Sequence, residues 1–192
     1  GCIMENEVPK GIGSMAAILG LEVKRIEQVC KEISKEKRNQ VEIANYNCPG
    51  QIVISGEKSA ILEANKRLKE AGARRTIELN VSGPFHSSML KGAGKKLETA
   101  LMETEIHKMK IPYISNVTAE IITDQTDHNQ IKNLLGRQVY SSVKWQQSME
   151  KLIGYGVDTL IEIGPGKTLS GFLKKIDQTV SVINIERVED LG

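Results

Sequence analysis

Residues 13–81 carry the pattern that most restricts the fold of this 192-residue chain. Alternating or short apolar runs predict strands, and apolar residues at helical spacing predict helices. In chain order they spell β-α-β-β-α-β, with strands at 14–19, 41–45, 51–56 and 76–81 and helices at 23–33 and 61–71. That order is the ferredoxin-like split βαβ motif, a compact two-layer unit. A fold of this kind implies no particular function.

After residue 81 the chain passes to a second, larger unit. Short strands at 111–115, 159–163 and 180–185 alternate with helical patterns, one of which begins after a capping Asp127. Such alternation predicts an α/β domain with a parallel, doubly wound sheet. Three strands are few for such a sheet to stand alone, because a parallel sheet needs helices on both of its faces. We therefore expect residues 13–81 to form one unit, and 1–12 with 82–192 to form part of the larger one.

Composition excludes several classes of function. A net charge of +2 gives no electrostatic case for binding nucleic acid or an anionic membrane. Cys2, Cys30 and Cys48 are widely spaced, without a CxxC or Cys/His pairing, which argues against a disulfide framework or a zinc site. No apolar run approaches the roughly 18 residues of a membrane span. Acidic residues interrupt any signal peptide, so we expect a cytoplasmic protein. From the cysteine pattern we expect no bound metal.

The strongest candidate for chemistry is His86. It follows a strand and Gly83-Pro84, and it precedes a helix that Ser87 or Ser88 is placed to cap. A histidine on such a loop can face a cleft, and the positive end of the helix helps to keep it neutral, as a general base must be. The alternative interpretation is a capping or surface histidine with no chemistry.

Other motifs are weaker. Gly166-Lys167-Thr168 suggests a phosphate loop, but the first glycine of that motif falls at Ile161, so the motif fails. The sequence has no Gly-x-Ser-x-Gly elbow to present a nucleophilic serine. Arg74 and Arg75 could bind a phosphate or an acidic protein face, or could simply be solvated at the start of a strand.

Seven segments, taken in order, resemble the malonyl-CoA:acyl-carrier-protein transacylase family of bacterial fatty-acid synthesis and, more loosely, polyketide synthase acyltransferase domains. They are VPKGIGSMAA (8–17), NYNCPGQ (45–51), VSGPFH (81–86), SNVT (115–118), QVY (138–140), VKW (143–145) and EIGPGK (162–167). The resemblance spans all 192 residues but only about the C-terminal two thirds of the family's chain.

The resemblance implies an α/β-hydrolase-like domain with an inserted ferredoxin-like subdomain. It also implies transfer of malonyl from coenzyme A, through a serine ester, to the phosphopantetheine thiol of acyl carrier protein. His86 matches the catalytic histidine, and Gln138 the residue whose backbone carbonyl orients it. The remaining matches are substrate positions at Met4, Asn47, Gln51 and Phe85, and basic residues of the coenzyme A and carrier-protein mouth at Arg74 and Arg75.

The departures from the family pattern divide the hypotheses. The sequence lacks the family's Gly-His-Ser-x-Gly elbow and N-terminal oxyanion loop, and the arginine that pairs with malonyl would fall just before Gly1. We therefore expect a transferase piece that is inactive alone and becomes active with the missing N-terminal segment. It needs no cofactor, since the coenzyme A thioester is a substrate. The alternative is a non-catalytic fragment that docks carrier protein.

Overall fold

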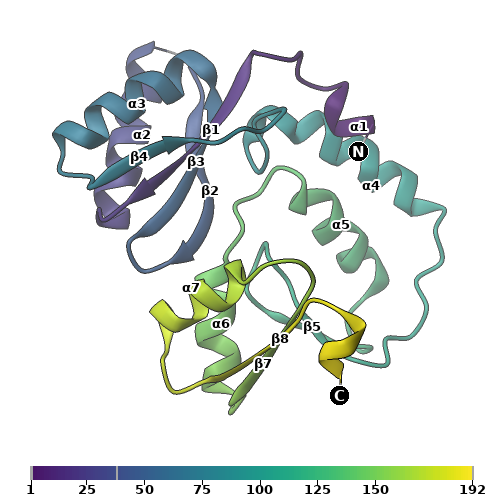
Figure 1. Ribbon diagram of the computed structural model, residues 1–192. Coiled ribbons are helices and arrows are strands. Elements are labelled where there is room, and N and C mark those ends of the chain that lie inside the picture. Colours follow the sequence, from purple (N-terminus) through teal and green to yellow (C-terminus); the bar gives the residue numbers. More distant parts are fainter. Residues whose placement is uncertain (1, 38, 192) are drawn as a thin grey trace.

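The computed structural model describes residues 2–37 and 39–191, and its first unit contains the six elements expected from periodicity (Figure 1). They are β1 (Gly13–Leu19), α2 (Val23–Lys37), β2 (Val41–Cys48), β3 (Gln51–Glu57), α3 (Lys58–Glu70) and β4 (Arg75–Glu78). The strands form a sheet in the order β2-β3-β1-β4, in which every neighbouring pair is antiparallel. We call this the four-stranded unit. Its last strand ends at Glu78, three residues earlier than predicted.

Both faces of this sheet are buried. On one face, α2 and α3 lie side by side (Figure 1) and enclose a core of isoleucine, valine, leucine and alanine that includes Ile18, Ile33, Ile54 and Leu68. A smaller cluster, made by Met15, Ala17, Ala44 and Val53, covers the other face together with Leu79 and Phe85. Burial on both faces explains why β1 and β3 have near-continuous runs of buried residues instead of strict alternation.

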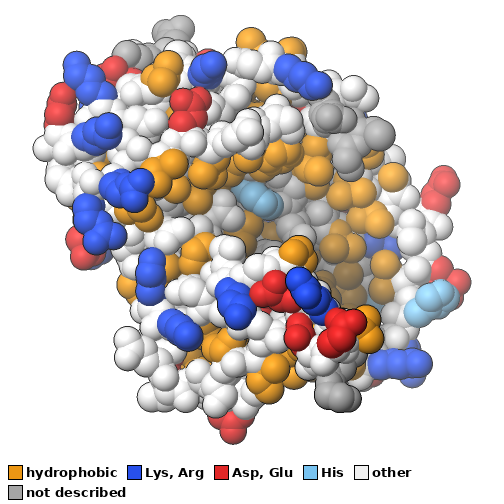
Figure 2. Space-filling view, in the orientation of Figure 1, with side chains coloured by type: hydrophobic (Ala, Val, Ile, Leu, Met, Phe, Trp, Pro, Cys, Tyr) orange, Lys and Arg blue, Asp and Glu red, His pale blue; other side chains and the backbone are white. Residues whose placement is uncertain are grey.

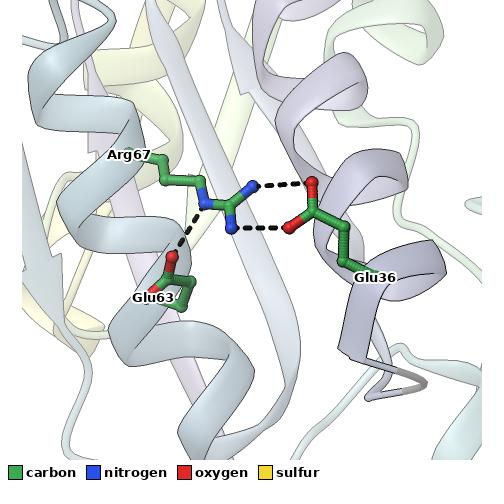
Figure 3. A network of polar contacts seen from close by, with 3 residues as sticks. All are labelled: Glu36, Glu63 and Arg67. Carbon is green, nitrogen blue, oxygen red and sulfur yellow. Dashed lines mark hydrogen bonds and ion pairs between the residues drawn. The ribbon is translucent and has the colours of Figure 1, made fainter.

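A network of three charged residues joins the two helices of the unit (Figure 3). The Arg67 guanidinium on α3 donates to both carboxylate oxygens of Glu36 on α2, at 3.2 and 2.7 Å. Its Nε donates to Glu63 one turn earlier on α3, at 2.8 Å. Because solvent reaches these groups and screens their charges, we expect each pair to contribute little to the free energy of unfolding. The buried core, not this network, supplies most of the stability of the unit.

The remaining elements pack beside the four-stranded unit. Helix α4 lies against α5, and α6 and α7 pack against the parallel pair of strands β7 and β8. Their bounds are α1 (Cys2–Glu5), α4 (Lys91–Met102), β5 (Tyr113–Ile114), β6 (Ile121–Ile122), α5 (His128–Gln138), α6 (Trp145–Gly154), β7 (Thr159–Ile163), α7 (Thr168–Ile176) and β8 (Ser181–Ile185), with short 3-10 helices η1 (Ser88–Leu90) and η2 (Val188–Leu191). The α/β class is confirmed. None of the described helices is long and apolar enough to cross a membrane.

One predicted strand has a different partner. We expected 111–115 to join the parallel sheet, but Tyr113–Ile114 pairs antiparallel with Ile121–Ile122 instead. A tight turn between them returns the chain, with the Ser115 N–H donating to the Glu120 carbonyl and the Ala119 N–H donating to the Ser115 carbonyl. A turn this short can join only antiparallel strands, because a parallel pair needs a long crossover. The capping of α5 by Asp127 is confirmed, since its carboxylate accepts from the Gln130 N–H.

Strand β2, at the edge of the sheet, connects the two parts of the molecule. The Val143 N–H donates to the Ala44 carbonyl at 2.8 Å, and the Tyr46 N–H donates to the Val143 carbonyl at 2.9 Å. The Ser142 hydroxyl donates to the Ile43 carbonyl at 2.6 Å. The segment between α5 and α6 therefore runs beside β2, bridged in parallel at Asn45 and Val143.

Close packing of α4 on α5 yields a prediction about Gly94. A Cβ at Gly94 would lie 2.4 Å from the Tyr140 ring and 2.7 Å from the Gly136 carbonyl oxygen, whereas one at Gly171 in α7 would meet nothing within 4 Å. We expect Gly94→Ala to lower the free energy of unfolding by about 1–3 kcal/mol through overpacking. The matched Gly171→Ala should raise it by roughly 0.5–1 kcal/mol through helix propensity. Urea unfolding measures both, and a Gly94→Ala chain as stable as its parent contradicts the packing.

Candidate active site

His86 lies on a loop held against the second face of the sheet. Residues 79–87, the histidine loop, follow β4, and the Phe85 ring packs into the Met15–Ala17–Ala44–Val53 cluster. Pro84 is fully buried and so close to β1 that a Cβ on Gly13 would lie 2.3 Å from its ring. Two apolar side chains next to the histidine thus fix the position of its backbone.

The backbone of His86 is itself unusual. Its φ of 57° places it in the left-handed region, which a residue with a Cβ occupies at a cost of roughly 1–2 kcal/mol. Such a conformation persists only where the surrounding structure enforces it, and it is typical of functional sites. Strain at this position indicates that the direction of the imidazole is constrained by the fold.

The imidazole meets a backbone carbonyl at the end of α5. His86 Nδ1 lies 3.1 Å from the carbonyl oxygen of Gln138, and the Ser141 backbone also interacts with the ring. A carbonyl oxygen can only accept a hydrogen bond, so Nδ1 must carry the proton. The lone pair is then on Nε2, which is the nitrogen available to take a proton from another group. The contact joins residues 52 positions apart in the chain.

Burial lowers the pKa of His86 below its ordinary value of 6.5, because the charged imidazolium is poorly solvated. The backbone carbonyls of Gln138 and Ser141 act in the opposite direction, since they stabilise the protonated ring, but burial has the larger effect. The imidazole is therefore neutral at pH 7. A neutral ring with a fixed tautomer has the properties required of a general base.

The capping prediction was wrong in its chemistry. Ser87 is the residue before η1, but its hydroxyl donates to the Pro84 carbonyl at 2.7 Å and does not cap the helix. Ser88 instead turns toward β2, where its backbone N–H donates to Glu42 Oε1 at 2.7 Å and its hydroxyl donates to the same oxygen at 2.5 Å. A carboxylate from a distant strand therefore takes the place of the local cap.

The other predicted residues fall into three groups. Met4 and Phe85 line one narrow crevice together with Val8 and Leu90, whereas His86 is not among the residues that line it. Asn47 and Gln51 lie at the turn between β2 and β3, where Gln51 Oε1 accepts from Lys175 at 3.2 Å. Within the described part of the chain, no hydrogen bond joins either of them to His86.

Arg74 and Arg75 are exposed and stand at the opposite end of β4 from the histidine loop. A four-residue strand spans about 13 Å, so these guanidinium groups do not share the immediate surroundings of the imidazole.

Figure 2 shows a hollow in the face between the four-stranded unit and the helices opposite it. Hydrophobic side chains gather around the hollow, and a histidine side chain is visible inside it. Over residues 2–37 and 39–191, no group of three or more histidine, cysteine, aspartate or glutamate side chains could hold a metal ion. The chemistry that these residues offer is proton transfer by an oriented imidazole.

Sequence reasoning missed the residues that support this arrangement. Glu42 and Ser142 hold the segments on either side of the imidazole, through contacts between residues 46 and 99 positions apart. Neither residue belongs to a local motif. Glu42 is a polar position in an alternating strand, which is the ordinary pattern of a solvated face.

Comparison with known proteins shows which family the chain belongs to. The model of the acyl transferase domain matches residues 1–191. The chain belongs to the acyl transferase domain family. It is 45% identical over 191 residues to the malonyl CoA-acyl carrier protein transacylase of Bacillus subtilis (strain 168), matching 100% of this chain and 59% of that protein. The transacylase of Staphylococcus aureus (strain MSSA476) is 43% identical, with 61% of its length matched.

Solved structures agree with these relatives. The transacylase of Clostridium perfringens superposes with a TM-score of 0.91 at 44% identity, over 99% of this chain and 58% of that chain. A malonyl-transacylase in complex with a type II polyketide synthase acyl carrier protein, called PlMCAT:AntF, gives a TM-score of 0.94 at 36% identity, over 99% of this chain and 60% of that one. This acyltransferase chain thus spans about 60% of the length of the relatives that it matches.

The lowered pKa of His86 can be measured directly. We expect imidazole ¹⁵N spectra to show a neutral ring protonated on Nδ1 that titrates below 6.5. The unfolded chain then binds this proton at higher pH than the folded chain does, so the contribution of His86 to stability is lost as the pH falls below about 6.5 and is constant above it. We expect the urea midpoint of the parent to fall relative to that of His86→Gln as the pH is lowered from 8 to 5, with the loss beginning near pH 6.5. A titration midpoint at or above 6.5 contradicts the assignment.

Proposed function

We propose that this chain supplies the general base of a malonyl-CoA:acyl-carrier-protein transacylase. The observation that carries the proposal is the contact between His86 Nδ1 and the Gln138 carbonyl, which leaves Nε2 able to accept a proton. The family match and the names of the relatives support the choice of substrates. Without them, the same geometry would support proton abstraction in general.

In the proposed mechanism, His86 Nε2 takes the proton of a serine hydroxyl as the serine oxygen attacks the malonyl thioester carbon. The bond to coenzyme A sulfur then breaks, and His86 returns the proton to the departing thiolate. In the second half, His86 removes the proton of the carrier-protein phosphopantetheine thiol, whose sulfur attacks the malonyl ester carbon. The bond to the serine oxygen then breaks, and His86 gives the proton to that oxygen, which restores the serine hydroxyl. The Gln138 carbonyl keeps the ring oriented through both steps. The thioester is itself a substrate, so these steps require no cofactor.

We assign the four-stranded unit to an inserted ferredoxin-like subdomain covering 13–81, and 1–12 with 82–192 to an α/β-hydrolase-like domain. The sheet order β2-β3-β1-β4 and the parallel pairing of β7 with β8 support this division.

An uncovered face supports a role for a further segment of the same protein. Ile161, Ile163 and Ile183 on β7 and β8 are 53, 78 and 47% exposed, on the face opposite α6 and α7. Parallel sheets are normally covered on both faces, so these isoleucines suit a further strand and helix. We propose that an N-terminal segment, bearing the serine, the oxyanion loop and the arginine for malonyl, packs there.

We place the acyl group beside Met4 and Phe85, with Asn47 and Gln51 along the pantetheine channel. Met4 and Phe85 line the same narrow crevice, and Phe85 directly precedes His86 in the chain, which supports the first part of this placement. The aromatic ring of Phe85 leaves little room for an α-methyl group, and one methyl group typically discriminates by about 1–3 kcal/mol.

Joining this chain to the N-terminal part of the Bacillus subtilis relative tests the function. We expect the joined protein to transfer malonyl from coenzyme A to carrier protein, and the chain alone to transfer none. His86→Ala should lower the rate by roughly 10²–10⁴-fold, whereas His107→Ala, at an exposed histidine, should leave it unchanged. Full activity of the His86→Ala protein would refute the base assignment. Activity of the isolated chain would refute the proposal that the serine is supplied by an N-terminal segment.

Exposed arginines favour a second candidate function, docking of acyl carrier protein without chemistry. Arg74 and Arg75 project from the start of β4, and one similar structure is a complex with an acyl carrier protein. We expect the double change to Ala to weaken binding of phosphopantetheinylated carrier protein by roughly 2- to 30-fold. Binding should also weaken with added salt. Lys24→Ala on α2 is the matched control, and calorimetry measures all three. Binding that neither arginine affects would eliminate this surface.

A further inference from the structure

Strand β2 lies between the two segments that meet at the imidazole. We call residues 138–144 the carbonyl loop, because it contributes the Gln138 and Ser141 carbonyls that face His86. Within the sheet β2 has a neighbour on one side only, so the outer hydrogen-bonding groups of its backbone are available to other segments. The carbonyl loop uses them through Val143, which bonds to both Ala44 and Tyr46.

The same strand holds the histidine loop through a side chain. Glu42 Oε1 accepts two hydrogen bonds from Ser88, which is two residues beyond His86. Both are charge-assisted, which makes them stronger than bonds between neutral groups. They also satisfy a backbone N–H at the start of η1 that has no partner within its own helix. One carboxylate therefore anchors Ser88, the residue that directly follows the histidine loop.

The irregular pairing of β2 fits this double role. Its register against β3 shifts between Ile43 and Asn45, and again between Tyr46 and Cys48. Such bulges bend a strand and re-aim its groups, and they are frequent beside active sites. The first shift falls at Ala44, whose carbonyl receives the Val143 N–H. Thus β2 departs from regular pairing where it meets the carbonyl loop.

We infer that Glu42 is a positioning residue for His86 and that, with Ser142, it ties the histidine loop and the carbonyl loop to one strand so that the imidazole meets the Gln138 carbonyl. The inference deepens the proposed function, on which it rests for its catalytic meaning. Glu42 acts through Ser88, and it does not touch the reacting groups. Ser142 lies four residues after Gln138, and it acts through its hydroxyl, which donates to the Ile43 carbonyl on β2.

Two physical facts make such an anchor necessary. The left-handed conformation of His86 is unfavourable and needs external restraint. In addition, the Nδ1–carbonyl contact joins residues 52 positions apart, on two loops that share no secondary structure. With both loops fastened to β2, their separation is set by a single rigid element.

The imidazole ¹⁵N spectrum of this chain tests the inference without any turnover. We expect Glu42→Ala to convert the single Nδ1–H tautomer of His86 to a mixture and to move its pKa upward, toward the ordinary value, as the ring gains solvent. Glu42→Gln retains an oxygen that accepts from Ser88 and should resemble the parent. Glu70→Ala, which removes an exposed carboxylate from the end of α3, is the matched control and should change nothing.

A second pair of variants keeps the test decisive if Glu42→Ala fails to fold, as judged by circular dichroism. Ser142→Ala should disturb the tautomer in the same direction, and Ser142→Thr, which keeps a hydroxyl, should restore it. The inference is overturned if folded Glu42→Ala retains the parent tautomer and pKa, or, should that protein not fold, if Ser142→Ala does so.

Kinetics of the joined protein separate this inference from the proposed function. There Glu42→Ala should lower kcat by about 10- to 100-fold with KM little changed, as expected for misplacement of a reacting group. An inactive joined protein with an intact His86 signature would refute the function and leave the positioning role standing. Parent-like kcat for folded Glu42→Ala would refute the positioning role and leave the function standing.

Discussion

The contact between the His86 imidazole and the Gln138 carbonyl depends on a sheet that is buried on both faces. Helices α2 and α3 cover one face, and the histidine loop, through Phe85, covers part of the other. An apolar anchor of this kind places a polar side chain more securely than hydrogen bonds alone, because removing the ring would expose the sheet face to water. The same packing contacts therefore bury the second face of the sheet and position His86. Gly13 illustrates this, since its missing side chain leaves the space that Pro84 occupies.

A carbonyl partner gives the imidazole different properties from those that a carboxylate would give. A buried carboxylate would stabilise the imidazolium strongly and raise its pKa, whereas a carbonyl dipole does so weakly. At His86 the effect of burial exceeds the effect of the two carbonyls, and the pKa is lowered. The ring is thus fully available as a base at neutral pH. It also holds an accepted proton loosely, which suits the proposed step in which that proton is returned to a leaving thiolate.

Local periodicity predicted the elements of the four-stranded unit well, because their apolar faces repeat within single segments of the chain. The errors lie where distant residues decide. Strand β4 ends three residues earlier than predicted, and β5 pairs antiparallel with β6 across a tight turn instead of joining the parallel sheet. Ser88 bonds to the Glu42 carboxylate on β2 instead of capping its helix. No pattern within ten residues of Ser88 could have indicated Glu42. His86 was a candidate because of its place between a strand and a helix, but Gln138 was identified only through resemblance to a family, since that place does not specify the partner of the imidazole.

Edge strands are a liability for any sheet, because their unpaired backbone groups invite association with other chains. In this molecule the carbonyl loop occupies part of the outer edge of β2, through the paired bonds of Val143 and the hydroxyl of Ser142. The same contacts determine where the Gln138 and Ser141 carbonyls stand. Protection of the edge and orientation of the imidazole therefore cannot vary independently. Any sequence change that loosens β2 from the carbonyl loop would expose an edge and release the histidine together. This coupling explains why the support for the site is found on a strand that contributes no group to the chemistry.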